Sequence, residues 1–262
     1  MALDKNTITQ LAEHLENCQL QARDTTKITD EHPAMDWNDA YAIQDEILGR
    51  KIARGARVAG YKAGLTSHAK MKQMGITTPV FGFLVDEFSV PDGGEVKFSE
   101  LIHPKVEPEI CFVTRSELRG PGCHIANVLA ACDFVLPGIE VIDSRYRDFK
   151  FDLKSVVADN TSASRFVVGG RIADARSVDL RTMGIVLEKN GVPVSFGAGA
   201  AVLGHPAAAV AMLVNHLGQR GQALPAGSLV LSGGITEAVS VQRGDNVTLR
   251  VQHLGSVSLR FA

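Results

Sequence analysis

One short acidic stretch limits what this chain of 262 residues can fold into. Residues 103–113, HPKVEPEICFV, are rich in apolar and β-branched side chains, which is typical of a β-strand. Alternate side chains of a strand share one face, so Glu107 and Glu109 are expected about 7 Å apart on the same side. Neighbouring carboxylates repel each other and are costly to bury, and hard divalent cations prefer oxygen ligands. The pattern is therefore compatible with a metal site.

Two interpretations of this strand stay open. Glu140 stands in a similar apolar setting, VLPGIEVID over residues 135–143, and is a candidate third carboxylate. In the second interpretation, Glu107 and Glu109 lie on the solvated face of an edge strand. Pro108 fits that interpretation because proline in sheets prefers edge strands.

Composition indicates an ordinary globular protein. Hydrophobic residues make up 45% and charged residues 21%, and the net charge of −2 gives no reason to expect nucleic acid or an anionic membrane as a partner. The four cysteines are far apart, which favours buried thiols in a reducing cytoplasm. Residues 1–6 lack the plan of a signal peptide, and no uninterrupted apolar run approaches 18 residues, so we expect no membrane span.

The beginning of the chain predicts two helices. Apolar residues recur at helical spacing over residues 8–20, where Thr7 and Gln10 resemble a capping box. A second helix is expected over residues 38–54, with Gly55 as its end.

The rest of the chain changes to short apolar runs broken by glycine. A strand over residues 58–66 contains Lys62, whose side chain is expected to reach water along the strand. A short helix over residues 67–74 and a lid-like segment over residues 75–82 follow. Further signals are a hairpin at Pro91–Gly94, a hairpin at Asn190–Gly191, a helix beginning at Pro206, and strands and turns over the last forty residues or so.

These elements predict an α+β fold. We expect a small N-terminal helical section over residues 1–57 and a metal-binding, mixed and largely β catalytic domain over residues 58–262. Common catalytic motifs are missing: no phosphate loop, HExxH or GxSxG occurs, and GAGAA at residues 197–201 lacks the third glycine of a dinucleotide fingerprint. Any chemistry then falls to acidic residues and one lysine.

Five motifs, in this order along nearly the whole chain, resemble one enzyme family. They are GLTS at 64–67, HPKVEPE at 103–109, IEVIDSR at 139–145, DN at 159–160 and GHP at 204–206. They are similar to the hydratase/decarboxylase family of the fumarylacetoacetate hydrolase fold group. The resemblance implies a fold of that type and a divalent-metal-dependent carbon–carbon lyase.

The resemblance also implies a set of site residues. The metal carboxylates fall on Glu107, Glu109 and Glu140, and the metal is expected to be Mg²⁺, with Mn²⁺ able to replace it. The active-site lysine falls on Lys62. Ser162 is expected to help hold a substrate carboxylate, and the backbone near Leu65 to contact the substrate.

One departure from the family favours decarboxylation. The hydratases carry an aspartate in the lid motif Pro-Asp-Phe-Gly, whereas this chain has Val80 in Pro79–Gly82. The resemblance then implies decarboxylation of 2-oxohex-3-enedioate to 2-hydroxypenta-2,4-dienoate in aromatic meta-cleavage catabolism, with Val80 as an apolar wall near the departing carboxylate. The second candidate within the family is 2-hydroxypentadienoate hydratase.

Two further functions are compatible with the chain. It could be a catalytically silent partner of a hydratase, although Lys62 and the three glutamates speak against this. A related hydrolase of acylpyruvates would need a His–Glu pair that cannot be placed. The resemblance also implies a complex with the pathway hydratase and a homo-oligomer. Arg145 and Arg147 are candidates either for binding a substrate anion or for ordinary salt bridges.

Overall fold

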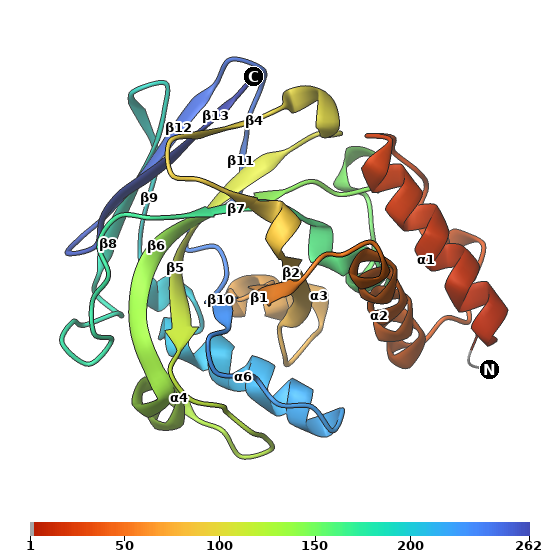
Figure 1. Cartoon of the computed structure of the whole chain (residues 1–262), viewed down its shortest axis with the longest axis horizontal. Helices are drawn as coiled ribbons and strands as arrows, with labels where there is room; N and C mark the ends of the chain where they lie inside the picture. Colours follow the sequence, from red (N-terminus) through yellow and green to blue (C-terminus); the bar gives the residue numbers. More distant parts are fainter. Residues whose placement is uncertain (1–2) are drawn as a thin grey trace.

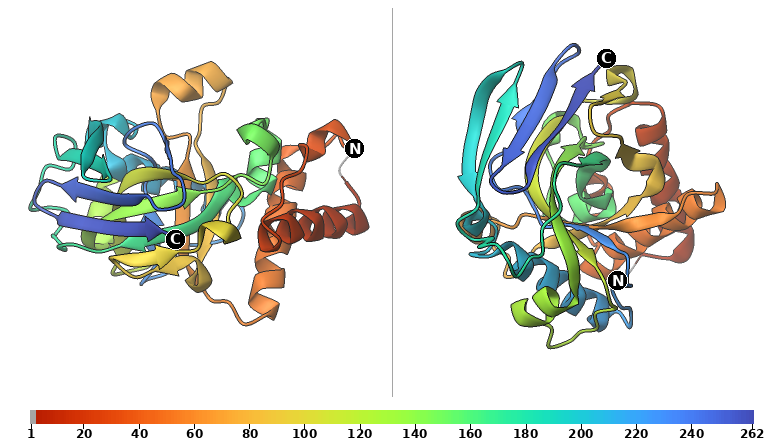
Figure 2. Two further views of the ribbon diagram at one scale, coloured as in Figure 1. Left: turned by 90° about the horizontal axis from the view of Figure 1, so that it is seen from above. Right: turned by 60° about the vertical axis from the view of Figure 1, so that its left-hand side comes forward.

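A helical start and a two-sheet β body make up the described residues, 3–262, of this computed structural model (Figures 1 and 2). The α-helices are α1 (Lys5–Leu20), α2 (Trp37–Ala53), α3 (His68–Met74), α4 (Ile125–Ala131), α5 (Leu153–Ala158) and α6 (Pro206–Gln219). The strands are β1 (Val58–Gly64), β2 (Val80–Val85), β3 (Ser89–Val90), β4 (Gly94–Val96), β5 (Lys105–Thr114), β6 (Cys132–Ile142), β7 (Ala163–Val168), β8 (Gly184–Lys189), β9 (Val192–Ala198), β10 (Leu229–Leu231), β11 (Val239–Ser240), β12 (Asn246–Val251) and β13 (Gly255–Phe261).

The strands form two mixed sheets. The larger sheet has eight strands in the order β2-β1-β10-β5-β6-β7-β3, with β11 paired to β5, and the smaller has five in the order β4-β13-β12-β8-β9. Most neighbours are antiparallel, while the pairs β1–β10, β3–β7 and β4–β13 are parallel. In Figure 1 the helices α1 and α2 lie on the opposite side of the molecule from β8 and β9. The expected α+β fold class is confirmed.

Local capping explains where the first two helices begin. The Asp4 side chain accepts a hydrogen bond from the Thr7 backbone N–H, so α1 begins a turn earlier than predicted, and the predicted capping box of Thr7 with Gln10 is wrong. Helix α2 begins with a reciprocal cap between Asp36 and Asp39. It ends before Gly55, whose φ of 101° suits a glycine.

Of the two predicted hairpins, one is confirmed and one is wrong. Asn190 and Gly191 have φ angles of 55° and 76° and join the antiparallel strands β8 and β9, as a tight hairpin turn requires. Pro91–Gly94 does form a turn, because the Gly94 N–H donates to the Pro91 carbonyl at 2.8 Å. However, β3 pairs with β7 and β4 pairs with β13, so this turn sends the chain from one sheet to the other.

The acidic strand β5 lies inside the larger sheet, which excludes the edge-strand interpretation. It pairs with β6 on one side and with β10 and β11 on the other. Pro108 fits an interior strand because its carbonyl accepts from the Ile235 N–H, on the side where neither β10 nor β11 pairs with it. In an antiparallel strand the backbone N and O of one residue point to the same side, so the Pro108 nitrogen also points away from β6. The missing N–H of this proline therefore costs no hydrogen bond between β5 and β6.

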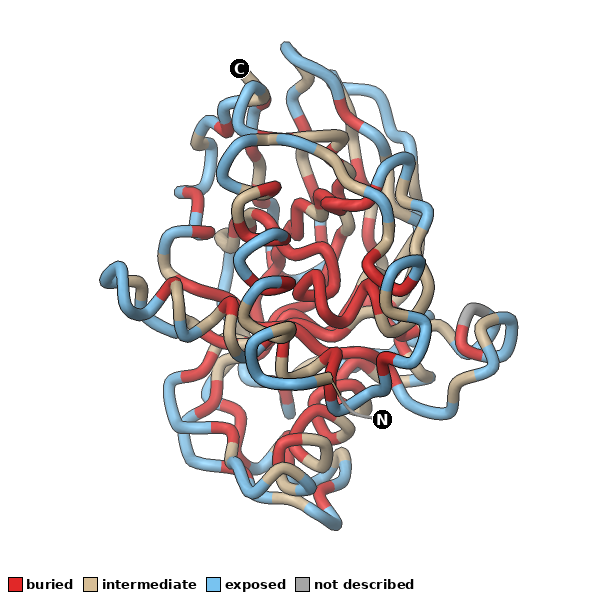
Figure 3. Tube along the Cα trace, turned by 90° about the vertical axis from the view of Figure 1, so that its right-hand side faces the viewer, coloured by how far each residue is buried: buried red, intermediate tan, exposed pale blue. Residues whose placement is uncertain are grey.

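Apolar side chains pack on both faces of the larger sheet, and the buried segments run through the middle of the molecule (Figure 3). On one face, Ile110 and Phe112 of β5 belong to a cluster that includes Leu213 of α6. On the other face, Cys111 belongs to a cluster with Leu15 of α1 and Ile43 of α2. Odd-numbered residues of β5, which include both glutamates, therefore face the side covered by the N-terminal helices.

Helix α6 is the one long apolar helix found among the described residues. The segment Gly199–Gln219 is long and apolar enough to cross a membrane by length and composition alone. In the fold, Val210, Leu213, Val214 and Leu217 of α6 are buried against the larger sheet. This burial explains the apolar composition as that of a core helix.

The structure resolves the question about the two arginines. Arg145 is buried, forms an ion pair with buried Asp159, and donates to the carbonyls of Asp143 and Ala163 at 2.8 and 3.0 Å. Burial raises the pKa of Asp159 to about 6 despite the arginine beside it. Arg147 is exposed and pairs with Asp24 at 3.0 Å. Both are salt-bridge residues, and Arg145 is tied into the fold.

We expect Arg145→Ala to destabilise the protein by about 3–5 kcal/mol, because it leaves Asp159 buried without its charge partner. Arg147→Ala removes an exposed pair and should change stability little, so it is the matched control. Urea unfolding followed by circular dichroism measures both. Equal stability of the two variants would contradict this assignment.

Candidate metal centre

Strand register brings the three predicted carboxylates together. Glu107 of β5 lies directly opposite Glu140 of β6, and Glu109 follows two residues along the same face. One carboxylate oxygen from each of the three lies within 4.8 Å of the others. Glu109 and Glu140 are fully buried, whereas Glu107 is partly exposed.

Lys62 completes the cluster, and its predicted contact with water is wrong. Its side chain is only 2% exposed. Strand β1 lies between β2 and β10, and the Lys62 ammonium reaches Glu140 Oε2 at 2.9 Å across the end of β10. The same ammonium donates to the Thr161 carbonyl at 3.2 Å. The carboxylates thus hold the lysine inside the sheet, where burial alone would expel it.

Burial and like charge dominate the electrostatics of the cluster. Burial, together with the charges of Glu140 and Glu107, raises the pKa of Glu109 well above its usual range. Burial also raises the pKa of Glu140 to about 7, although Lys62 opposes the shift. Burial would lower the pKa of Lys62, but the three carboxylates outweigh it and raise that pKa.

A divalent cation fits these residues. When the three carboxylates are ionised, one ammonium leaves two negative charges uncompensated. The Oε1 atoms of Glu109 and Glu140 are buried without a hydrogen-bond partner. Unpaired buried acceptors are costly, and a hard cation takes several oxygen ligands of this kind.

A strained turn covers the lysine. Asn160, Thr161 and Ser162 have φ angles of 47°, 49° and 62°. This is a left-handed backbone conformation that residues other than glycine rarely adopt. The Asn160 side chain holds the turn against β2, accepting from the Phe83 N–H at 2.9 Å and donating to the Phe83 carbonyl at 3.0 Å. The Ser162 and Thr161 hydroxyls are buried without partners, which leaves them available to a ligand.

Two features of this turn could not be found from motifs alone. The family resemblance indicated Ser162 but not Thr161, whose carbonyl accepts a hydrogen bond from Lys62. It also missed Gly82, where an added Cβ would lie 2.5 Å from Thr161 Oγ1 and 2.9 Å from the Asn160 carbonyl oxygen. Glycine at this point of β2 lets the turn approach the sheet.

A pocket of about 430 Å³ reaches the cluster at Glu107. Its other lining residues include Leu65, Thr66 and Gln73 on one side and Gly234 and Thr236 on the other. Leu65, a predicted contact residue, has a φ of 59° and follows β1 directly. The pocket gives a small molecule access to the side of the cluster where Glu107 lies.

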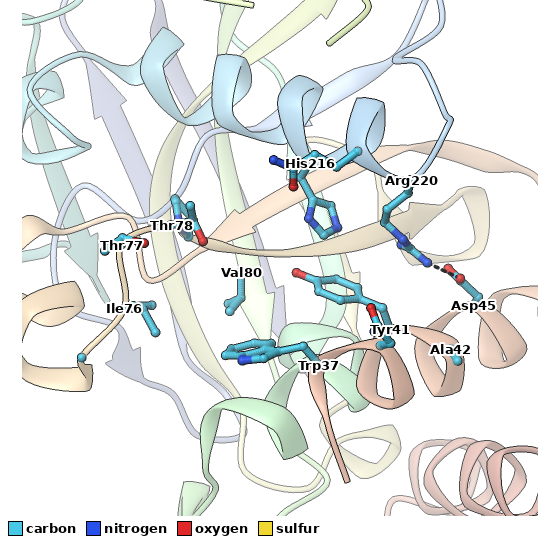
Figure 4. Close-up of a pocket in the computed structure, with 14 residues that line it drawn as sticks. Trp37, Tyr41, Ala42, Asp45, Ile76, Thr77, Thr78, Val80, His216 and Arg220 are labelled. Carbon is cyan, nitrogen blue, oxygen red and sulfur yellow. Dashed lines mark hydrogen bonds and ion pairs between the residues drawn. The ribbon is translucent and has the colours of Figure 1, made fainter. Parts of the chain in front are cut away.

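A larger pocket of about 650 Å³ lies between α2, the segment Gly75–Val80 and α6 (Figure 4). Val80 lines this pocket, is 3% exposed, and pairs with Gly64 of β1. A Cβ added to Gly64 would lie 3.4 Å from Val80 Cγ2 and 3.7 Å from Lys62 Nζ. Val80 is therefore a neighbour of both the pocket and the cluster.

The larger pocket has no acidic cluster of its own. The rings of Tyr41 and His216 lie 4.4 Å apart, and Arg220 pairs with Asp45 at one end (Figure 4). Burial lowers the pKa of His216 to about 4 and raises the pKa of Tyr41 to about 12, so both are neutral near pH 7. The glutamate cluster is accordingly the stronger candidate for chemistry.

Comparison with known proteins adds three findings. The family model for the fumarylacetoacetate (FAA) hydrolase C-terminal region matches residues 59–262. The chain is 60% identical over 259 residues to the 4-oxalocrotonate decarboxylase of Pseudomonas sp. (strain CF600), covering 99% of this chain and 98% of that protein. It is 39% identical over 260 residues, or 98% of each protein, to the 2-hydroxyhexa-2,4-dienoate hydratase of Comamonas testosteroni.

A solved structure is also similar throughout. It is the 4-oxalocrotonate decarboxylase from Pseudomonas putida G7, complexed with magnesium and adipate. The TM-score is 0.97, the sequence identity is 58%, and the match covers 99% of each chain.

We predict that Mg²⁺ stabilises the protein more at pH 8 than at pH 6. The pKa of Glu140, raised from 4.5 to about 7, favours the folded state at low pH, and this contribution is lost as pH rises through about 7. A divalent cation stabilises the ionised cluster, so its benefit grows over the same window. Thermal unfolding with and without Mg²⁺ measures the difference.

Glu140→Gln keeps the size of the side chain but removes both the titrating group and one proposed metal carboxylate, so the Mg²⁺ effect itself should become smaller. The pH dependence of the Mg²⁺ effect should shrink in this variant. A Mg²⁺ effect that is the same at pH 6 and pH 8 in the unmodified protein would refute the assignment of a cation to these carboxylates.

Proposed function

Because the chain belongs to the fumarylacetoacetate hydrolase family, we propose that its glutamate cluster is the metal centre of a decarboxylase. The enzyme acts on 4-oxalocrotonate (2-oxohex-3-enedioate) and yields CO₂ and 2-hydroxypenta-2,4-dienoate, a step of aromatic meta-cleavage catabolism. The observation that carries the proposal is the three carboxylates within 4.8 Å of one another beside buried Lys62, in a chain 60% identical to a decarboxylase of this name.

Glu107, Glu109 and Glu140 would hold the metal, which is Mg²⁺, with Mn²⁺ able to replace it; the magnesium-bound relative supports this choice. When bound, a divalent ion supplies Lewis-acid stabilisation of the negative charge that develops on the C2 oxygen of the substrate. That charge arises because the C5–C6 bond breaks, CO₂ departs, and the electron pair moves along the conjugated chain to the C2 oxygen.

Lys62 is proposed as the catalytic cation. Its ammonium is fixed by Glu140 at 2.9 Å and by the Thr161 carbonyl at 3.2 Å. From this position it adds positive charge near the 2-oxo end of the substrate and can pass a proton to the developing enol oxygen.

Ser162 and Leu65 are proposed to bind the substrate. The Ser162 hydroxyl is buried without a partner next to the residue that orients Lys62, so a carboxylate oxygen of the substrate would satisfy it. Leu65 lines the pocket that reaches Glu107, and its left-handed backbone turns there at the end of β1.

Val80 is proposed as an apolar wall for the departing carboxylate. Its side chain is buried, lies next to Gly64 of β1 near the Lys62 ammonium, and lines the larger pocket. A carboxylate is charged before the reaction and leaves as neutral CO₂, so an apolar neighbour disfavours the starting state relative to the product. A hydratase function lacks this support, because the lid motif has valine in place of the hydratase aspartate.

We also propose properties of the whole protein beyond the site. All seven proposed site residues lie within residues 58–262, and the family match begins at residue 59, which supports a catalytic domain over residues 58–262 on which the helical section 1–57 packs. Four free, buried cysteines support a cytoplasmic location. A complex with the hydratase that consumes the enol product, and a homo-oligomer, remain proposals from the family resemblance.

We expect the purified protein to release CO₂ from 2-oxohex-3-enedioate when Mg²⁺ is present, and to lose this activity after exhaustive chelation. Coupled detection of CO₂ measures the reaction, and 2-hydroxypenta-2,4-dienoate serves as the comparison substrate for hydration. Activity that survives complete metal removal, or hydration without CO₂ release, would overturn the proposal.

Val80→Asp should lower kcat for CO₂ release by at least about tenfold, because a carboxylate would face the charge that must leave, and one lost factor of ten corresponds to about 1.4 kcal/mol. Thr78→Asp is the matched control, since Thr78 is exposed in the same pocket. Undiminished decarboxylation by Val80→Asp would remove this role for Val80.

A further inference from the structure

A glycine turn outside the five family motifs contacts the glutamate cluster. Ser232, Gly233 and Gly234 follow β10 directly. The Gly233 N–H donates to Glu109 Oε2 at 2.6 Å, and the Ser232 hydroxyl donates to the Ile110 carbonyl at 2.6 Å. The turn is thereby attached to β5 at the residue beside Glu109.

The first glycine has no room for a side chain. Gly233 has a φ of 109°, and a Cβ added to it would lie 2.1 Å from Thr66 Oγ1 and 2.8 Å from Thr66 Cβ. Thr66 cannot easily move away, because it is buried and its carbonyl accepts from the Leu203 N–H at 3.1 Å. Any larger residue would therefore displace the turn, together with the Gly233 N–H that donates to Glu109.

The second glycine borders another carboxylate. A Cβ added to Gly234 would lie 3.1 Å from Glu107 Cδ and 3.2 Å from Glu107 Oε1. Gly234 also lines the 430 Å³ pocket that reaches Glu107. A methyl group here would therefore displace the carboxylate or narrow the space beside it.

We propose that Gly233 and Gly234 are positioning residues that set the metal affinity of the cluster, an inference that rests on the metal centre of the proposed function. One turn orients Glu109 by a backbone hydrogen bond and leaves clearance for Glu107, while Lys62 orients Glu140 from the other side. Groups that hydrogen-bond to metal-binding carboxylates commonly change metal affinity by about 10–100-fold when they are disturbed.

The chain contains matched controls for both glycines. Gly227 has a φ of 78° with nothing within 4 Å of an added Cβ, so Gly227→Ala carries the left-handed backbone strain without a steric clash. Gly184 has no positive φ, and an added Cβ would meet only Gln252 Oε1 at 3.8 Å. Gly184→Ala is therefore the control for Gly234→Ala.

The experiment measures Mn²⁺ binding to the full-length protein without substrate. Calorimetry or the electron paramagnetic resonance signal of free Mn²⁺ gives the affinity. Gly233→Ala and Gly234→Ala should each bind Mn²⁺ about 10–100-fold more weakly than the unmodified protein, and both controls should bind it normally. Thermal unfolding of the metal-free proteins shows whether each variant is folded. If Gly233→Ala does not fold, the milder Gly234→Ala decides.

Unchanged Mn²⁺ affinity in Gly234→Ala, or weakening as large in the controls, would overturn the inference. If the unmodified protein binds no Mn²⁺, the metal centre itself fails and this inference fails with it. If it binds Mn²⁺ but releases no CO₂ from 2-oxohex-3-enedioate, only the proposed activity fails. The two failures are thus distinguishable.

Discussion

The buried repulsion among three carboxylates is the constraint on which the site depends. Two of these side chains are fully buried, and a single ammonium offsets them. Burying charge without a partner costs far more than an exposed pair gains, so the fold must either protonate the cluster or supply a cation. The raised pKa values of Glu109 and Glu140 reflect the first solution, and a divalent ion is the second.

Strand pairing and buried polar contacts hold the cluster and the turn beside it in place. Antiparallel register fixes Glu107 opposite Glu140, and Lys62 contacts Glu140 beside the last residue of β10, which lies between β1 and β5. The left-handed turn at Asn160–Ser162 is held by Phe83 and by the buried pair of Asp159 with Arg145. Strain of this kind persists only where its surroundings hold it, and it is common at functional sites.

The acidic strand and the family could be predicted from the sequence. The alternation of side chains along a strand and the short family motifs are each contained in a few neighbouring residues. Burial of Lys62 depends on pairing between β1, β10 and β5, which lie far apart along the chain, so a local pattern suggested water instead. The turn at Pro91–Gly94 had hairpin chemistry, but its strands pair with β7 and β13. In the sequence Gly233 resembles an ordinary turn residue, because its contacts with Glu109 and Thr66 join distant parts of the chain.

Anomalous diffraction from crystals containing Mn²⁺ is the most direct test of the central claim. We expect one strong peak within coordination distance, roughly 2.0–2.6 Å, of an oxygen atom of each of Glu107, Glu109 and Glu140. A peak that lacks any one of these glutamates, or Mn²⁺ bound only elsewhere in the protein, would contradict it.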